Sequence, residues 1–185
     1  NRTTDSAAAA TAMATGYKTN NSMLGMLPDG TKPESIAELA QNKGLSTGIV
    51  VTSYVLDATP AGFYAHVDKR GKRKKIAEDL IEFKPDVIVG GGRKYFTEKK
   101  YTDENLIEKA VNAGFTYVET PEKFYSTWTP PILSLIHIPE PTRPAEISYA
   151  VFCLKNKKKE VKAAGKFDRT KRGDIFLQRS NNEWN

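Results

Sequence analysis

An Asp-Ser pair stands directly in front of an alanine-rich segment, in the stretch TTDSAAAATAMATG at residues 3–16. A serine hydroxyl is a poor nucleophile at neutral pH unless its surroundings stabilise the alkoxide. The first turn of a helix supplies part of that stabilisation, because its free N–H groups and the helix dipole favour negative charge. Ser6 is therefore a candidate nucleophile at the start of a helix over residues 7–15. The alternative is that Asp5 and Ser6 only cap a buried helix.

Helical and strand-like segments alternate from Asp5 to about Ser126, with short turns between them. This alternation predicts an α/β fold in which a mostly parallel sheet, in a partial doubly wound arrangement, has helices on both faces. We expect further helices over residues 33–44, 74–83 and 102–114 and one that starts at Pro121, and strands over residues 46–55, 85–92 and 115–120. The third of these helices is expected to begin with Thr102 or Asp103 as its cap.

The alternation stops after Ser126, where a proline-rich stretch is followed by a lysine run. We therefore expect a folded domain over residues 1–127 and an irregular tail, non-native or disordered, over residues 128–185. Of the net charge of +6, residues 1–127 carry +1 (17 Lys and Arg against 16 Asp and Glu) and residues 128–185 carry +5 (11 against 6). The basicity belongs to the tail, so it does not indicate a nucleic-acid surface on the domain.

Cysteine and apolar content set further limits. The only cysteine is Cys153 in the tail, so residues 1–127 offer no thiol for a disulfide, a metal or catalysis. No stretch approaches the roughly 20 apolar residues of a membrane span. Because the chain starts at Asn1 without a Met, we expect it to be part of a longer protein.

Three segments occur in the order TDSAAAATAMATGYKT, DATPAGFYAHVDKR and PDVIVGGGRKYF. Together they closely resemble the alkaline phosphatase family over about residues 2–126. The resemblance implies hydrolysis of phosphate monoesters through a phosphoserine intermediate on Ser6, which would face a zinc ion. It also implies that Asp5 steadies the phosphate-binding arginine, which falls on Arg70. A guanidinium can contact two phosphate oxygens at once.

The same resemblance implies a metal site. Thr59 falls on a magnesium ligand and Asp57 on a residue that holds a water in the magnesium shell. The family uses two zinc ions and one magnesium ion, and most of their Asp, Glu and His ligands have no counterpart in this chain. We therefore expect a truncated and inactive fragment of an active family.

Simpler interpretations stand beside these roles. Arg70 lies in KRGKRKK, where six of seven residues are basic, and such runs are commonly solvated surface. Thr59 precedes a proline and could be a turn residue. His66 matches a family position that is not a metal ligand, so a packed, hydrogen-bonded histidine is expected. GGGRK at residues 90–94 lacks the spacing of a phosphate-binding loop and predicts a turn at a strand end.

The tail has its own resemblance. Residues from about 132 to 159, which include LSLIHI, EPTRP and ISYAVFCL, resemble the translation of a sequencing-library adapter followed by a poly-A run translated as lysines. The alternatives are a divergent insertion in a phosphatase and a basic nucleic-acid-binding tail, although no recognised module is present.

The expected partners are small-molecule phosphate monoesters, with no nucleic acid and no membrane segment. By resemblance the intact enzyme would be a homodimer that is periplasmic or secreted. Two alternatives remain open for the chain. It could be a metal-free phosphate-binding or non-catalytic relative, or a sulfatase-like or phosphomutase-like protein, although the latter predicts a Cys or Thr nucleophile instead of Ser6.

Overall fold

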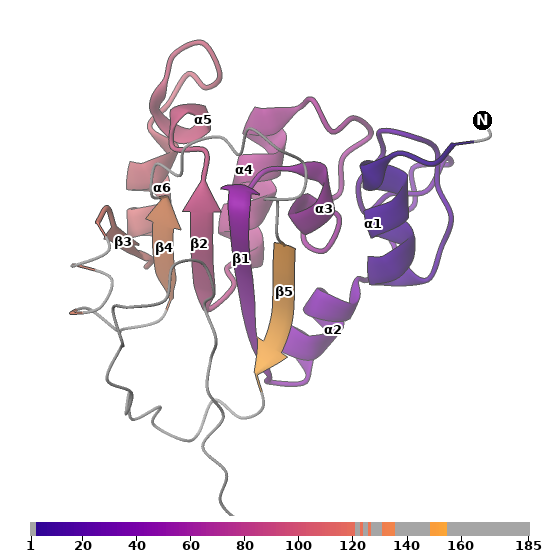
Figure 1. Cartoon of the computed structure of the whole chain (residues 1–185), viewed down its shortest axis with the longest axis horizontal. Helices are drawn as coiled ribbons and strands as arrows, with labels where there is room; N and C mark the ends of the chain where they lie inside the picture. The colour runs from indigo at the N-terminus through magenta and orange to yellow at the C-terminus, as the bar shows by residue number, and fades with distance from the viewer. Residues whose placement is uncertain (1–2, 121–122, 124–125, 127–130, 136–148, 155–185) are drawn as a thin grey trace, which may run out of the picture.

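The computed structural model describes residues 3–120, 123, 126 and 131–135 and the backbone of residues 149–154. Its helices are α1 (Ser6–Thr15), α2 (Ile36–Asn42), α3 (Ala58–Ala61), α4 (Arg73–Phe83), α5 (Lys94–Thr97) and α6 (Leu106–Asn112). Its strands are β1 (Ser46–Tyr54), β2 (Val87–Gly91), β3 (Thr116–Val118), β4 (Ile132–Leu135) and β5 (Tyr149–Leu154). The alternation of helices and strands confirms the predicted α/β class (Figure 1).

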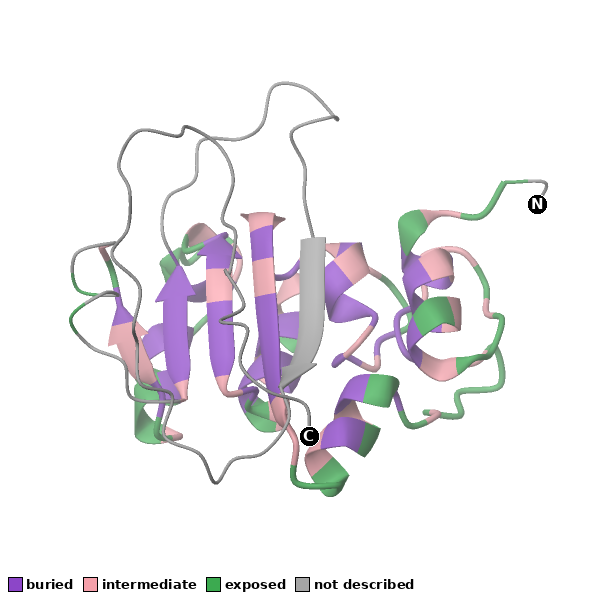
Figure 2. Ribbon diagram, turned by 60° about the horizontal axis from the view of Figure 1, so that its bottom comes forward, coloured by how far each residue is buried: buried purple, intermediate pink, exposed green. Residues whose placement is uncertain are grey.

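The strands form one sheet in the order β3-β4-β2-β1-β5. The first four run parallel to one another, whereas β5 pairs antiparallel with β1. Parallel strands are covered by helices, and their sequences are correspondingly apolar: β1 and β2 bury most of the stretches TGIVV and VIVGG (Figure 2). The carboxyl ends of these parallel strands lie at one edge of the sheet, which is where α/β proteins place their sites.

The large apolar side chains gather between the sheet and the helices α4 and α6. Ile76, Ala77 and Leu80 recur along α4 at helical spacing and are almost completely buried. Leu106 and Ala110 repeat the pattern on α6. Burial of this apolar surface is the main force that holds the helices on the sheet.

Alanines let α1 pack closely against α3. A Cβ atom on Gly62, directly after α3, would lie 2.6 Å from the Cβ of Ala10 on α1, too close for any side chain other than hydrogen. Ala7, Ala10 and Ala14 are buried along the same helix. The small residues therefore bring the start of α1 close to the segment that follows β1.

Two helices begin a few residues after their predicted starts, because the residue that caps each of them lies further along the chain. Helix α6 begins after Asn105, whose Oδ1 accepts hydrogen bonds from the backbone N–H groups of Ile107 and Glu108. Neither Thr102 nor Asp103, the two caps that the sequence suggested, is the N-cap, and Thr102 instead forms a local turn with Glu104. Helix α2 likewise begins after Ser35, which forms a capping box with Glu38.

The structure also differs from the expected irregular tail over two short stretches. Ile132–Leu135 forms β4, which lies between β3 and β2, and Tyr149–Leu154 forms β5 at the edge of the sheet. Proline content and the loss of helical period concealed β4, because a buried strand of four residues leaves no periodic signal. The remainder of the tail, residues 136–148 and 155–185, lies outside the described residues, as does most of the helix predicted from Pro121.

Candidate functional site: the phosphate corner

Ser6 is the first residue of α1, and Asp5 is the N-cap. The Asp5 carboxylate accepts a hydrogen bond of 2.9 Å from the backbone N–H of Ala8. Ser6 itself is exposed, so its hydroxyl can be reached by a ligand. The predicted placement of Ser6 in the first helical turn is confirmed, and so is the capping role of Asp5.

Arg70 approaches Ser6 from 64 residues further along the chain. Its Nη1 donates a hydrogen bond of 2.6 Å to Ser6 Oγ and lies 3.7 Å from Asp5 Oδ2. The Arg70 side chain is 36% exposed, so part of the guanidinium stays open to solvent. We call Asp5, Ser6 and Arg70 the phosphate corner, because a hydroxyl, a helix N-terminus and a half-open guanidinium meet there.

Two residues that sequence analysis missed hold this corner together. The amide oxygen of Asn21 accepts a hydrogen bond from Asp5 N–H, and Ser22 N–H donates to Asp5 Oδ2. The carbonyl of Ser22 accepts a hydrogen bond of 2.7 Å from Arg70 N–H. The run Asn20-Asn21-Ser22 is typical of a turn, and that composition was the available signal.

Asp57 and Thr59, the residues implied in a magnesium site, lie at the start of α3, where Asp57 is the N-cap. One Asp57 oxygen lies 3.3 Å from Arg73 Nη2, and the other accepts a hydrogen bond of 2.9 Å from Ser53 Oγ. Arg73 also donates to the Leu56 carbonyl and lies 5.4 Å above the Tyr95 ring. Both oxygens of the Asp57 carboxylate therefore have protein partners.

The side chains at this end of α3 do not supply the ligands of the metal set that the resemblance implies. Among the residues that the structure describes, no group of three or more His, Cys, Asp or Glu side chains is placed to hold a metal ion. Asp57 is engaged by Arg73 and Ser53, and it is the one acidic residue that the resemblance connects to a metal. The described residues therefore do not fit two zinc ions and one magnesium ion by themselves.

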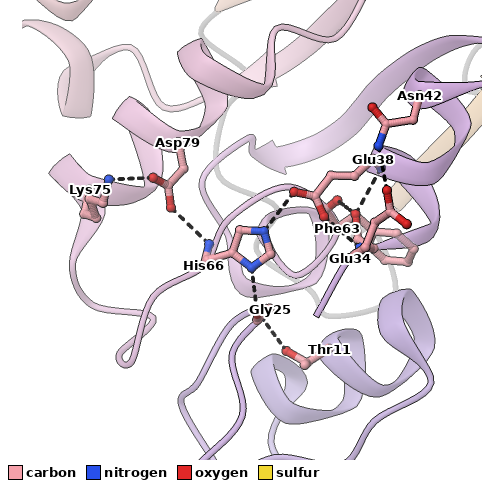
Figure 3. A network of polar contacts seen from close by, with 10 residues as sticks. Thr11, Gly25, Glu34, Glu38, Asn42, Phe63, His66, Lys75 and Asp79 are labelled. Atoms are coloured by element: carbon pink, nitrogen blue, oxygen red, sulfur yellow. Dashed lines mark hydrogen bonds and ion pairs between the residues drawn. The ribbon is translucent and has the colours of Figure 1, made fainter. Parts of the chain in front are cut away.

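His66 belongs to a polar network that includes none of the three residues of the corner (Figure 3). Its Nδ1 lies 2.5 Å from the Gly25 carbonyl, and its Nε2 lies 2.9 Å from Glu38 Oε1. Because both partners are acceptors, both ring nitrogens must donate, which the imidazolium form does. The Glu38 hydrogen bond accordingly raises the pKa of His66 against the opposing effect of burial. The prediction of a packed, hydrogen-bonded histidine is confirmed.

Glu38 titrates in the opposite sense. Burial by itself would raise its pKa, but the hydrogen bonds from His66 and from Ser35 outweigh burial and lower the pKa. The backbone N–H of His66 meanwhile donates to Asp79, which pairs with Lys75 (Figure 3). The network thus joins α2, α4 and the loop before Arg70.

GGGRK forms the end of a strand, as predicted. Gly91 ends β2, Gly92 has a positive φ of 104°, and α5 begins just after Arg93. Arg93 forms an ion pair with Glu119. This segment therefore turns the chain from β2 into α5.

The fold and this corner define an α/β protein in which an exposed serine and a partly open arginine meet at the N-terminus of a helix. Residues 1–135 match the family model described as alkaline phosphatase. This chain therefore belongs to the alkaline phosphatase family, whose members are phosphomonoesterases. The match extends past Ser126 and includes β4.

Curated relatives agree with the family model. Alkaline phosphatase 4 of Bacillus subtilis is 43% identical over 123 residues, which are 63% of this chain and 26% of the relative. Alkaline phosphatase of Escherichia coli is 36% identical over 138 residues, which are 62% of this chain and 29% of the relative. The chain thus spans between a quarter and a third of the length of these relatives.

Solved structures of the family share the fold. Alkaline phosphatase from the Antarctic bacterium TAB5 superposes with a TM-score of 0.68 and 37% identity, over 73% of this chain and 40% of that chain. A variant of the TAB5 enzyme is described with Mg bound in its M3 site. In the described part of the present chain, none of the helices is long and apolar enough to cross a membrane.

Proposed function

We propose that this chain carries the phosphate-binding and phosphoryl-accepting part of an alkaline phosphatase site. The observation that carries the proposal is the 2.6 Å hydrogen bond from Arg70 to Ser6 Oγ at the N-terminus of α1. Donation from a guanidinium favours the alkoxide over the neutral hydroxyl, and the helix N-terminus acts in the same direction. The open part of Arg70 would contact the phosphate oxygens.

In the proposed reaction, Ser6 Oγ attacks the phosphorus of a phosphate monoester. The bond from phosphorus to the ester oxygen breaks, and the leaving alcohol takes up the proton that the serine loses. A water molecule then cleaves the bond between Ser6 Oγ and phosphorus, which restores the hydroxyl and releases inorganic phosphate. Positioning and charge neutralisation dominate phosphoryl transfer, and Arg70 would provide both.

The chain by itself is proposed to be inactive in turnover. The described residues hold no group of three metal-ligating side chains, and the bound metal ions of the family supply charge neutralisation and an activated water. For the intact protein we propose a homodimeric phosphomonoesterase that is periplasmic or secreted, on the strength of the family alone.

A second candidate function is metal-free phosphate binding without catalysis. The Asp57–Arg73 pair favours it, because Arg73 already supplies a positive charge to the carboxylate that the family connects to magnesium. Arg70 and Ser6 meet in a hydrogen bond of 2.6 Å, and a guanidinium binds phosphate oxygens through its own charge-assisted hydrogen bonds.

One experiment separates these proposals. Turnover of p-nitrophenyl phosphate with zinc and magnesium, and binding of inorganic phosphate, are measured for the full chain and for Ser6→Ala. Phosphate binding without turnover fits both candidate functions, and mass spectrometry of the full chain after incubation with p-nitrophenyl phosphate then separates them. A phosphoserine on Ser6 supports the phosphoryl-accepting role, and its absence supports phosphate binding alone. Turnover that Ser6→Ala abolishes supports catalysis by the chain itself, and turnover that survives Ser6→Ala contradicts the role of Ser6. An absence of phosphate binding contradicts both candidate functions.

A further inference from the structure

The side chain of Asn21 holds the backbone on both sides of residue 4. Its Oδ1 accepts a hydrogen bond of 3.1 Å from Asp5 N–H, and its Nδ2 donates a hydrogen bond of 3.1 Å to the Thr3 carbonyl. An amide side chain is suited to this task because it carries an acceptor and a donor next to each other. Asn21 therefore fixes the direction in which the chain enters α1 and presents Ser6.

The next residue continues the connection toward Arg70. The backbone N–H of Ser22 donates a hydrogen bond of 3.0 Å to Asp5 Oδ2, and its carbonyl accepts from Arg70 N–H at 2.7 Å. Ser22 has a φ of 73°, which is uncommon for a residue other than glycine. A residue other than glycine keeps such a backbone conformation only where the surrounding contacts hold it there. Residues in these conformations are concentrated at functional sites.

A short bridge fixes this turn to the rest of the molecule. Leu24 and Val67 exchange two backbone hydrogen bonds, of 2.8 and 2.9 Å. Leu24 is completely buried, so the bridge sits on the core. The turn at residues 20–23 is thus anchored at one end and contacts both halves of the phosphate corner at the other.

We propose that Asn21 is a positioning residue that sets the separation of Ser6 Oγ and the Arg70 guanidinium through this turn. Asn21 contacts the Ser6 side directly and reaches the Arg70 side only through the backbone of Ser22. The inference rests on the proposed function, since the separation matters for a phosphate group bound between the two side chains. Asn21 itself makes no contact with Ser6 Oγ or the guanidinium among the hydrogen bonds of the described residues.

The test compares Asn21→Ala with Asn42→Ala in the full chain. Asn42, the last residue of α2, is a matched control, because its side-chain amide donates one exposed hydrogen bond to the Glu34 carboxylate. Hydrogen exchange is followed at the amides of Asp5 and Arg70, with Ile49 in the core of β1 as the reference for global unfolding. Affinity for inorganic phosphate is measured by titration calorimetry.

In Asn21→Ala we expect exchange to accelerate about tenfold at both Asp5 and Arg70, with Ile49 unchanged, and phosphate affinity to fall about tenfold. Asn42→Ala is expected to leave all of these unchanged. Acceleration at Asp5 with unchanged exchange at Arg70 would overturn the proposal, because Asn21 would then act only on its own neighbour. A merely structural role of Asn21 would not accelerate exchange at both the Asp5 and Arg70 amides while leaving Ile49 unchanged.

A second variant covers the case in which Asn21→Ala loosens the core. Asn21→Asp keeps an acceptor for Asp5 N–H, but it loses the donor to Thr3 and adds a negative charge close to Asp5. It is therefore also expected to accelerate exchange at the Asp5 and Arg70 amides together, with Ile49 unchanged. Acceleration at Ile49 in both variants would also overturn the proposal. If the unaltered chain binds no phosphate, the proposed function fails, while the exchange comparison still decides the role of Asn21.

Discussion

Arg70 and Arg73 lie three residues apart in one basic run, and each meets an aspartate from a distant segment. Arg73 is 21% exposed and is fully engaged by Asp57, the Leu56 carbonyl and the Tyr95 ring. Arg70 is 36% exposed, contacts Asp5 only at 3.7 Å, and donates to a serine hydroxyl that is itself exposed. A saturated arginine stabilises the fold, whereas a partly open arginine can bind a ligand.

The strongest way to break this comparison is Arg73→Met. We expect the free energy of unfolding to fall by about 2 kcal/mol, because the half-buried Asp57 loses its cation and the Leu56 carbonyl loses a donor. Urea unfolding measures the change. A double-mutant cycle with Asp57→Asn is the control, and the second substitution should recover part of the loss. A change below about 0.5 kcal/mol would contradict a structural role for Arg73.

Arg70→Lys tests the other half of the comparison. We expect inorganic phosphate to bind at least about tenfold more weakly, because an ammonium cannot contact two phosphate oxygens in the plane of a guanidinium. The urea midpoint should change little, since the Arg70 side chain is only half-buried and its ion pair with Asp5 is long. Arg73→Lys is the matched control. Equal losses of affinity in the two variants would remove the distinction between the arginines.

The Glu38–His66 pair extends the comparison to an interaction that titrates. The pKa of His66 is raised from 6.5, so its contribution is complete below that pH and is lost as pH rises through the raised value. The pKa of Glu38 is lowered from 4.5, so its contribution is complete above that pH and is lost as pH falls through the lowered value. The pair is therefore expected to stabilise the fold most between about pH 4.5 and 6.5.

Glu38→Gln should flatten this dependence while it keeps the capping box, in which glutamine is also accepted. We expect a loss of about 1 kcal/mol near pH 6 and a smaller loss near pH 8.5. Urea unfolding at several pH values checks this, with imidazole NMR signals to follow His66 directly. Identical pH slopes in the two proteins would show that the ion pair does not form.

The smallest effect is expected for the exposed pair of Lys74 and Asp103. Asp103 is 91% exposed, and its contact with Lys74 at 2.9 Å is surrounded by solvent. Solvent and salt screen such pairs, so Asp103→Asn should leave the urea midpoint and phosphate affinity unchanged within error. A clear loss of stability would contradict the expectation that the more buried ion pairs contribute more to the free energy of unfolding.

Local sequence predicted most elements because their signals are local. The alanine run, Gly16 and the Asp-Ser pair placed α1 and its cap, and apolar spacing placed α4 and β2. The resemblance selected Ser6 and Arg70, which the fold brings within 2.6 Å. Sequence missed β4, since a four-residue segment with three apolar side chains, directly after two prolines, forms a strand only because β2 and β3 leave a place between them. The resemblance of residues 132–159 to a translated sequencing adapter stays a prediction, and within that range the structure describes only β4 and β5.

The sequence by itself determined the α/β alternation, the nucleophile candidate and the membership of a family, because these depend on periodicity and on short motifs. Only the tertiary structure decided which arginine of the basic run stays open, which one is saturated by Asp57, and that Asn21 and Ser22 connect the two halves of the phosphate corner. These contacts join residues far apart in the chain, and their geometry depends on how α1, α3 and the sheet pack together.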